Sequence, residues 1–328
     1  MIDVTIDEIE TFVSIARLGG FARAAEALHR SQPAISRRIE MLEDQLRTPI
    51  FERVHGGVVL TEAGRTFLPY AEALLASIKD GTEAVRGLER GEHGTVAVAL
   101  VGTLASTRFA GTLRTFGQRH PNVKLELRTA TSQEVGDLVR RGEVTLGLRY
   151  FGDSDPSLVS EVVTEEALLV VCAPEHRLAG RRVRDAQALA GERWVTFPPR
   201  RRRPEAFATA LEQRLAAAGL ASGDIIRIDS LTAQKRFVEA GFGIALLTES
   251  GVEEELRTGT LRTIDAPALR GGVPVTLVLR RKGYLSGAAR TLVTVIREGS
   301  AGRVSFARRS PRRAARWHPA RRSSGGPP

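Results

Sequence analysis

Hydrophobic residues at the start of the chain recur at the spacing of short helices. The apolar positions of residues 6–18 lie three or four apart, which predicts an amphipathic helix that the following pair of glycines ends. Residues 21–28 are rich in alanine and predict a second short helix, in which Ala24 and Ala25 allow another helix to approach closely. The pattern therefore predicts two helices packed against each other.

A third helix is expected over residues 32–46. Ser31 is a favourable N-cap residue, and Pro33 lies in the first turn, where a missing backbone N–H costs nothing. The apolar positions, which we expect to face the first two helices, are Ile35, Ile39, Leu42 and Leu46. The opposite face then presents Pro33, Ser36, Arg37 and Glu40 to the outside.

Two short strands and a long helix follow. Residues 50–53 and 58–60 predict a hairpin that turns at residues 55–57, and Thr61 is expected to cap a helix reaching residue 90. The long helix carries a seam of alternating steps of three and four, formed by Leu68, Ala71, Leu75, Ile78, Thr82 and Val85. Such a seam pairs two copies of a helix, or it packs one surface helix on its own domain.

Beyond Gly94 the pattern changes to apolar strands that alternate with helices. This alternation predicts an α/β domain with a parallel sheet. Strands are expected over residues 96–101, 123–128, 145–149, 161–173, 193–197, 243–247 and 273–280, and helices over residues 104–118, 132–141, 204–218 and 231–240.

The positive charge of the chain is unevenly distributed. The net charge is +10, but residues 1–90 hold 11 Lys and Arg against 14 Asp and Glu. Residues 301–328 hold eight Arg and no acidic residue, and they have too few aliphatic residues to fold, so we expect a disordered tail. A basic composition is therefore weak support for nucleic-acid binding, and the local pattern of the first sixty residues must carry that inference.

Several classes of protein are disfavoured by the sequence. The longest apolar run, residues 167–173, is too short to cross a membrane, and the first residues do not form an export signal, so we expect a cytoplasmic protein. The single cysteine, Cys172, is expected inside a buried strand. The six His residues are scattered, and no HExxH, GxSxG or phosphate-loop pattern occurs, so neither an enzyme nor a cofactor is expected.

The first sixty residues resemble the LysR family of transcription regulators. The resemblance rests on FVSIARLGGFARAAEALHRSQPAISRRIEMLEDQLRTPIFER and on VVLTEAG, although Arg47 stands where the family commonly has Gly. It implies a multidomain fold: an all-α winged helix-turn-helix over residues 1–60 and a linker or dimerisation helix over residues 61–91. A two-lobed α/β effector domain like the periplasmic binding proteins would occupy residues 92–300.

The family resemblance implies double-stranded DNA as a partner and a homo-oligomer, either a dimer or a tetramer. By position, Gln32, Pro33, Ser36 and Arg37 would face the major groove, while Arg38 and Arg53 would lie nearer the phosphates. A helix that opens with Gln and Ser can offer hydrogen bonds to base edges while nearby arginines hold the backbone. For Arg37 and Arg38, a merely solvated role is the alternative.

The rest of the chain resembles the effector domain of the family more loosely, through VTLGLRY, LLVVCAPEHRLAG and VEAGFGIALLT. One lobe would hold residues 92–163 and 269–300, and the other residues 164–268, with a ligand cleft between them. The positions that the resemblance assigns to a small-molecule effector are Gly102, Thr103, Thr131, Ser132, Arg149, Phe197 and Ser230. A domain that serves only oligomerisation and binds no ligand is the alternative.

An anionic effector is expected on two grounds. Hydroxyls and free N–H groups at the helix start formed by Thr131 and Ser132 favour an anion, although ordinary helix capping explains the same residues. The run of four arginines over residues 200–203 is either a solvated loop or a collar for an acidic effector.

Overall fold

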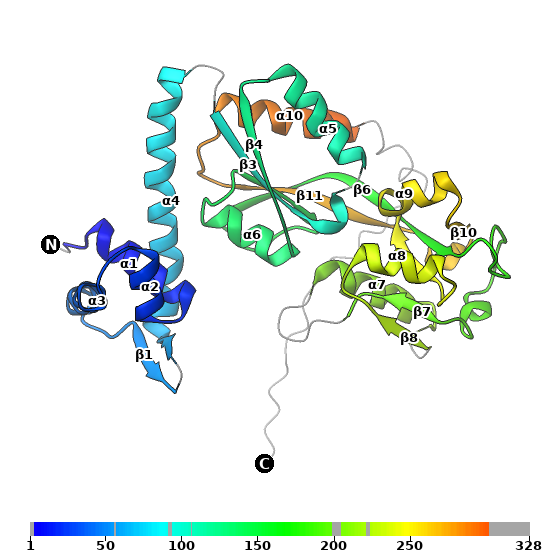
Figure 1. Ribbon diagram of the computed structural model, residues 1–328, viewed down its shortest axis with the longest axis horizontal. Helices are drawn as coiled ribbons and strands as arrows, with labels where there is room; N and C mark the ends of the chain where they lie inside the picture. The colour runs from blue at the N-terminus through cyan, green and yellow to red at the C-terminus, as the bar shows by residue number, and fades with distance from the viewer. Residues whose placement is uncertain are drawn as a thin grey trace, which may run out of the picture.

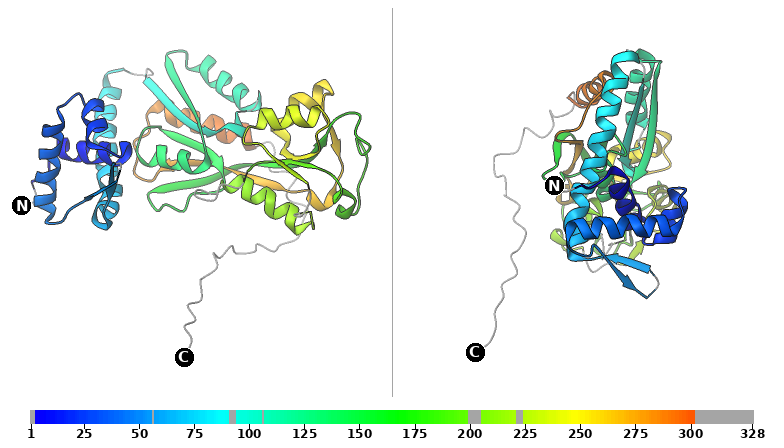
Figure 2. Two further views of the ribbon diagram at one scale, coloured as in Figure 1. Left: turned by 60° about the horizontal axis from the view of Figure 1, so that its bottom comes forward. Right: turned by 90° about the vertical axis from the view of Figure 1, so that its left-hand side faces the viewer.

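The computed structural model describes residues 3–55, 57–90, 94–105, 107–198, 205–220 and 224–301. The arginine run over residues 200–203, the linker at residues 91–93 and the tail from residue 302 onward lie outside the described residues, as does Gly56 in the predicted hairpin turn. A small helical unit and a long helix lie at one end of the molecule, and a two-lobed α/β body forms the rest (Figures 1 and 2).

The N-terminal unit has the three helices and the hairpin that the sequence predicts. Helices α1 (Ile6–Leu18), α2 (Phe21–Ala27) and α3 (Gln32–Leu46) precede β1 (Phe51–Val54) and β2 (Gly57–Leu60), which pair antiparallel. The core contains Ile9, Phe12, Ile15, Ile35, Leu42 and Ile50, each of them buried. The predicted inner face of α3 is thus the one that packs against α1 and α2.

Arg47 ends α3 in an unusual backbone conformation. Its φ of 55° and ψ of 32° lie in the left-handed region, which glycine adopts without the steric penalty of a Cβ atom. This geometry gives a physical reason for the glycine that the resemblance leads one to expect here. The arginine in this chain therefore carries backbone strain at the turn into the hairpin.

Helix α4 (Glu62–Arg90) begins where the predicted cap lies, since the Thr61 hydroxyl accepts a 3.0 Å hydrogen bond from the Gly64 amide. Part of its predicted seam packs on the helical unit of the same chain: Ala71 is buried, and Leu68 and Leu75 join that core. Among the side chains of α4 that the structure describes, the large hydrophobic residues left exposed are Tyr70, Leu74, Ile78 and Val85. The first half of the seam therefore packs on its own domain, while its later residues Ile78 and Val85 stay exposed in the single chain.

The α/β body is built on a seven-stranded sheet. Its strands are β3 (Gly94–Val101), β4 (Val123–Ala130), β5 (Leu146–Tyr150), β6 (Leu158–Cys172), β9 (Ala245–Thr248), β10 (Arg262–Ile264) and β11 (Gly272–Arg280). The order is β10-β6-β11-β5-β3-β4, with β9 also paired to β6. Cys172 is buried at the end of β6, where burial raises the pKa of its thiol to about 11.

The prediction of a parallel sheet is wrong for much of this body. The pairs of β3 with β4 and with β5 are parallel, as are β7 (Trp194–Thr196) and β8 (Ile225–Arg227). Strand β6, however, pairs antiparallel with β9, β10 and β11. The hydrophobic runs show where strands form but not their direction, and the long strands β6 and β11 run through both lobes.

Helices cover this sheet and complete the second lobe. Helix α5 (Thr107–Arg119) packs with α10 (Gly287–Ala301), while α6 (Ser132–Arg140) packs on β3, β5 and β11 beneath them in Figure 1. Helices α7 (Ala206–Ala217), α8 (Leu231–Glu239) and α9 (Glu249–Thr258) belong to the second lobe. The sequence analysis did not predict α9, α10, β8 or β10.

Candidate functional site

The outer face of α3 presents polar side chains to solvent. Gln32, Pro33 and Arg37 are exposed and Ser36 is half-buried. Within the part of the chain that the structure describes, the side chains of Gln32 and Arg37 make no hydrogen bond or ion pair. These groups are therefore available to a partner, and the packing of Ile35, Ile39 and Leu42 on the core fixes the direction in which they point.

The other two predicted arginines differ from Arg37. Arg38 forms an ion pair with Asp7 of α1 and donates a 3.4 Å hydrogen bond to the Thr11 hydroxyl. Arg53 is exposed on β1, the first strand of the hairpin. Arg38 is thus held by its own domain, whereas Arg53 projects from the wing.

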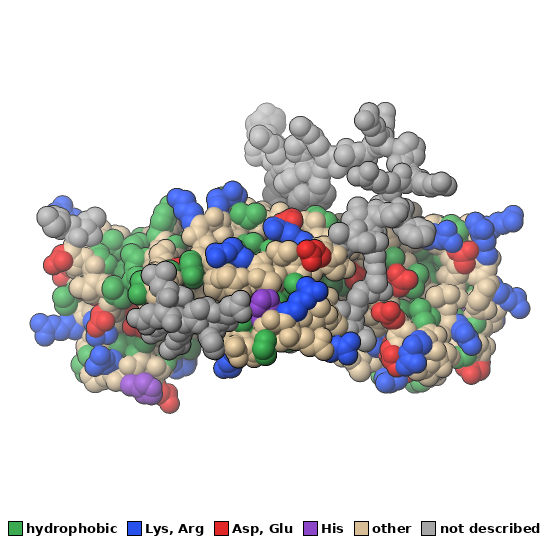
Figure 3. Space-filling view, turned by 90° about the horizontal axis from the view of Figure 1, so that it is seen from above, with side chains coloured by type: hydrophobic (Ala, Val, Ile, Leu, Met, Phe, Trp, Pro, Cys, Tyr) green, Lys and Arg blue, Asp and Glu red, His purple; other side chains and the backbone are tan. Residues whose placement is uncertain are grey.

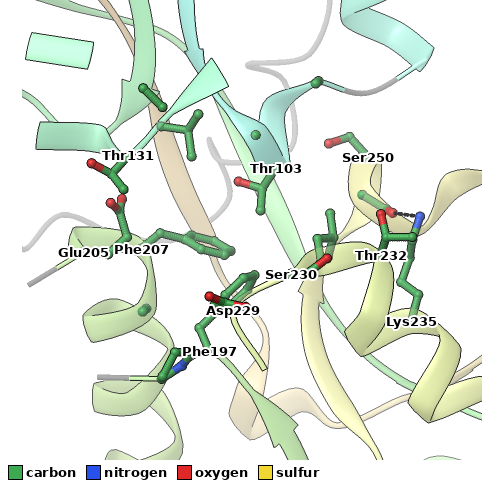
Figure 4. A pocket seen from close by; sticks show the side chains of 18 of the residues that line it. Thr103, Thr131, Phe197, Glu205, Phe207, Asp229, Ser230, Thr232, Lys235 and Ser250 are labelled. Atoms are coloured by element: carbon green, nitrogen blue, oxygen red, sulfur yellow. Dashed lines mark hydrogen bonds between the residues drawn. The ribbon is translucent and has the colours of Figure 1, made fainter. Parts of the chain in front are cut away.

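A pocket of about 480 Å³ lies between the two lobes of the body. Figure 4 shows Thr103 and Thr131 on one side and side chains of the second lobe opposite them. Five of the predicted effector residues line this pocket: Gly102, Thr103, Thr131, Phe197 and Ser230. Ser132 and Arg149 are buried beside it and are not among its lining residues.

The start of α6 is already bound by groups of the chain itself. Thr131 and Glu134 form a capping box, in which each side chain accepts a hydrogen bond from the backbone N–H of the other residue. The amide of Ser132 donates a 2.9 Å hydrogen bond to the Glu205 carboxylate, and its hydroxyl donates a second one. Ordinary capping is therefore present, and a carboxylate from the second lobe occupies the place predicted for an anion.

Aromatic stacking joins the lobes beside this contact. The ring of Tyr150, on β5, stacks on Phe207 of α7 with centroids 4.3 Å apart, and Phe207 also contacts Phe197 edge-on. Burial raises the pKa of the Tyr150 phenol well above its ordinary value, so the group stays protonated. The neighbouring Arg149 is buried, forms an ion pair with Asp153 and does not line the pocket.

The second-lobe wall of the pocket contains residues that the sequence analysis missed. Lys235 of α8 forms a 2.7 Å ion pair with Glu255 of α9, whereas the hydroxyl of Ser230, a predicted residue, caps α8 by accepting from the Ala233 amide. Other missed lining residues are Glu205, Phe207, Asp229, Ser250 and Glu254. For α9, the four-residue spacing of Val252 and Leu256 and the C-terminal Gly259 were the available signals.

Charged side chains of both signs are distributed over the described surface. On the side seen in Figure 3, Lys and Arg side chains are scattered along the molecule among Asp and Glu. Among the described residues, no group of three or more His, Cys, Asp and Glu is placed to hold a metal ion. Within the described ranges, no helix has the length and hydrophobicity that a membrane span requires.

Known protein families match almost the whole chain. Residues 6–65 match the bacterial regulatory helix-turn-helix protein of the lysR family, and residues 89–301 match the LysR substrate binding domain. The RuBisCO operon transcriptional regulator of Allochromatium vinosum is 30% identical over 289 residues, which cover 87% of this chain and 93% of the relative. These families and relatives are transcriptional regulators, not enzymes.

Solved structures share the arrangement of the N-terminal helical unit, the long helix and the two-lobed α/β body. A full-length OxyR variant from Pseudomonas aeruginosa aligns with a TM-score of 0.65 at 20% identity, covering 90% of this chain and 94% of that one. Full-length CbnR complexed with its target DNA aligns with a TM-score of 0.61 at 23% identity, covering 90% and 99%. The winged helix-turn-helix, the long helix and the two-lobed domain are thus those of a known fold. This chain belongs to the LysR family of bacterial transcription regulators.

Proposed function

We propose that this regulator binds operator DNA through α3 and the wing, and that a small molecule in the interlobe pocket modulates that binding. The observation that carries the proposal is that one chain has both a free polar face on α3 and, in a separate domain, a pocket of about 480 Å³. Gln32, Pro33, Ser36 and Arg37 would meet base edges in the major groove, and Arg53 would meet a phosphate. Arg38 would contribute less, because Asp7 already holds its guanidinium.

The exposed residues of α4 support a homo-oligomer. Tyr70, Leu74 and Ile78 are spaced by one helical turn and are exposed to solvent in the single chain. A second copy of α4 would cover them, and DNA-bound regulators commonly match two half-sites with a two-fold symmetric dimer. We place this oligomer, a dimer or a tetramer, in the cytoplasm together with its DNA.

The charge of the effector is less constrained than the sequence suggested. The expectation of an anion rested partly on the start of α6, where Glu205 now supplies the carboxylate. An acidic effector would have to displace Glu205 from Ser132, compete with Glu255 for Lys235, or bind the arginines over residues 200–203, which lie outside the described residues. A screen for the effector therefore has to include neutral and cationic compounds beside small acids.

Thermal-shift measurements on the full chain test the ligand-binding part of this proposal. Small carboxylates, amino acids, aromatic acids and amines are added singly, and an effector should raise the melting temperature further with each increase of its concentration above the Kd. A ligand present at 100 times its Kd stabilises the folded state by about 2.7 kcal/mol. If no compound class stabilises the protein while genome-wide mapping still finds specific bound sites, the effector domain acts only in oligomerisation.

A further inference from the structure

Helix α6 runs from the effector pocket to the contact with α4. It spans Ser132–Arg140, nine residues, and is therefore about 13 Å long at the usual rise per residue. At its start the amide and the hydroxyl of Ser132 are held by Glu205, a pocket-lining residue of the second lobe. The helix packs on β3, β5 and β11, so it is supported along its length.

The last turn of α6 meets a buried carboxylate of α4. The guanidinium of Arg140 forms an ion pair with Glu72, whose side chain is only 3% exposed. Glu72 also binds Arg17, in the last turn of α1, with a nitrogen to oxygen distance of 3.3 Å. One carboxylate thus joins an arginine of the effector domain to an arginine of the winged domain. Burial alone would lower the pKa of Arg140, but the nearby carboxylates of Glu72 and Asp137 raise it.

Neighbouring contacts hold the end of α6 close against α4. Gly142 has a φ of 66°, and an added Cβ atom there would lie 3.1 Å from the Cβ of Ala76, so the two segments are packed tightly. Lys79 donates a 2.8 Å hydrogen bond to the Gly142 carbonyl oxygen. Glu143 reaches Arg17 at 3.1 Å, and its pKa, which burial tends to raise, is lowered by Arg141 and Arg17. The junction is therefore both charged and closely fitted.

We propose that α6 couples the pocket to the winged domain, with Glu205 as its sensor and the Arg140, Glu72 and Arg17 cluster as its output. The inference rests on the proposed function and specifies how that function is regulated. A ligand that draws Glu205 away from Ser132 releases the start of the helix. Because a helix moves as a rigid body, Arg140 then shifts against Glu72. Glu72 passes this shift to Arg17 of α1, and α1 changes the orientation of α3, against which it packs.

A double-mutant cycle on the full chain tests this coupling without a known effector. Glu205→Ala imitates the released state, and Arg140→Met removes the link to Glu72 while keeping most of the side-chain volume. The readout is the Kd for an operator fragment selected from genomic DNA. We expect Glu205→Ala to change this Kd about fivefold or more, which is the usual lower range for coupled sites. In the Arg140→Met background the same substitution should change it less than about twofold.

A matched control separates coupling from a general loss of ion pairs. Arg297→Met breaks a 2.6 Å ion pair with Glu161 between α10 and β6, and neither residue lines the pocket. The full effect of Glu205→Ala should persist in that background. If Arg140→Met does not fold, Arg17→Met serves instead, because it leaves Glu72 paired with Arg140 and should still reduce the response.

Two results would overturn the coupling. One is an equal fold-change from Glu205→Ala in every background, and the other is no change in Kd from Glu205→Ala in the otherwise wild-type chain. Failure of the proposed function looks different. If a ligand raises the melting temperature but the mutant cycle is additive, the proposed ligand binding stands and the coupling through α6 is wrong. If the cycle is non-additive but no compound stabilises the protein, the coupling through α6 stands and the proposal of a small-molecule effector is wrong.

Discussion

The DNA-reading face and the effector pocket are built in opposite ways. The side chains proposed to read bases all come from the first half of α3, and those of Gln32 and Arg37 have no partner among the described residues. The pocket is lined by six separate segments, and its polar groups Glu205, Lys235 and Glu255 are bound to one another or to neighbours. A substitution on α3 should therefore affect binding alone, while one in the pocket should also affect folding.

The largest expected effect comes from the pocket wall. Phe207→Ala removes a side chain that is 3% exposed and that contacts the rings of Tyr150 and Phe197. We expect a loss of about 3–5 kcal/mol in the free energy of unfolding, as for other buried aromatic residues. Denaturant unfolding followed by the fluorescence of Trp194, which is buried in the same core, measures this loss.

Phe237→Ala provides the control for that measurement. Phe237 lies on α8 with 39% of its surface exposed and does not line the pocket, so its truncation should cost less than about 1 kcal/mol. Similar losses from both substitutions would remove the distinction between the pocket wall and the ordinary surface of the second lobe.

Substitutions on α3 should give the complementary result. Gln32→Ala and Ser36→Ala are each expected to weaken binding to the cognate operator by about 1–3 kcal/mol while leaving random DNA almost unaffected. The melting temperature should stay unchanged, because neither residue is part of the buried core. Fluorescence anisotropy with both kinds of DNA measures the difference.

Met41→Ala is the matched control on the same helix. Met41 is 47% exposed and lies one turn beyond Arg37, outside the first half of α3, so neither cognate nor random binding should change. Equal losses on cognate and random DNA from Gln32→Ala would mean that this residue only positions the phosphate backbone.

The two regions also differ in how far the sequence could predict them. Helices α1 to α4 and the hairpin agree with their predicted ranges to within about one residue, because spacing, caps and glycines are local signals. Gly102, Thr103, Thr131, Phe197 and Ser230 were placed at the pocket through family resemblance. Glu205 was missed because its contact with Ser132 joins residues that are 73 positions apart. No local pattern records such a contact.

The smallest effect that we predict concerns backbone strain at Arg47. Its φ of 55° places a Cβ atom in the left-handed region, at a cost of about 1–2 kcal/mol that glycine does not incur. Glycine in turn costs about 0.4–1 kcal/mol through the greater entropy of the unfolded chain. Arg47→Gly should therefore stabilise the winged domain by roughly 0.5–1 kcal/mol, measured by calorimetry of the full chain, with no change in sequence preference on DNA.

Arg47→Ala separates the backbone from the charge. It removes the same guanidinium but keeps a Cβ atom in the left-handed conformation, so it should give no gain in stability. If alanine stabilises as much as glycine, the strain lies in the charge of the arginine and not in its backbone. A change in operator preference with either variant would show that the end of α3 takes part in reading DNA, which would extend the DNA-reading face beyond its first half.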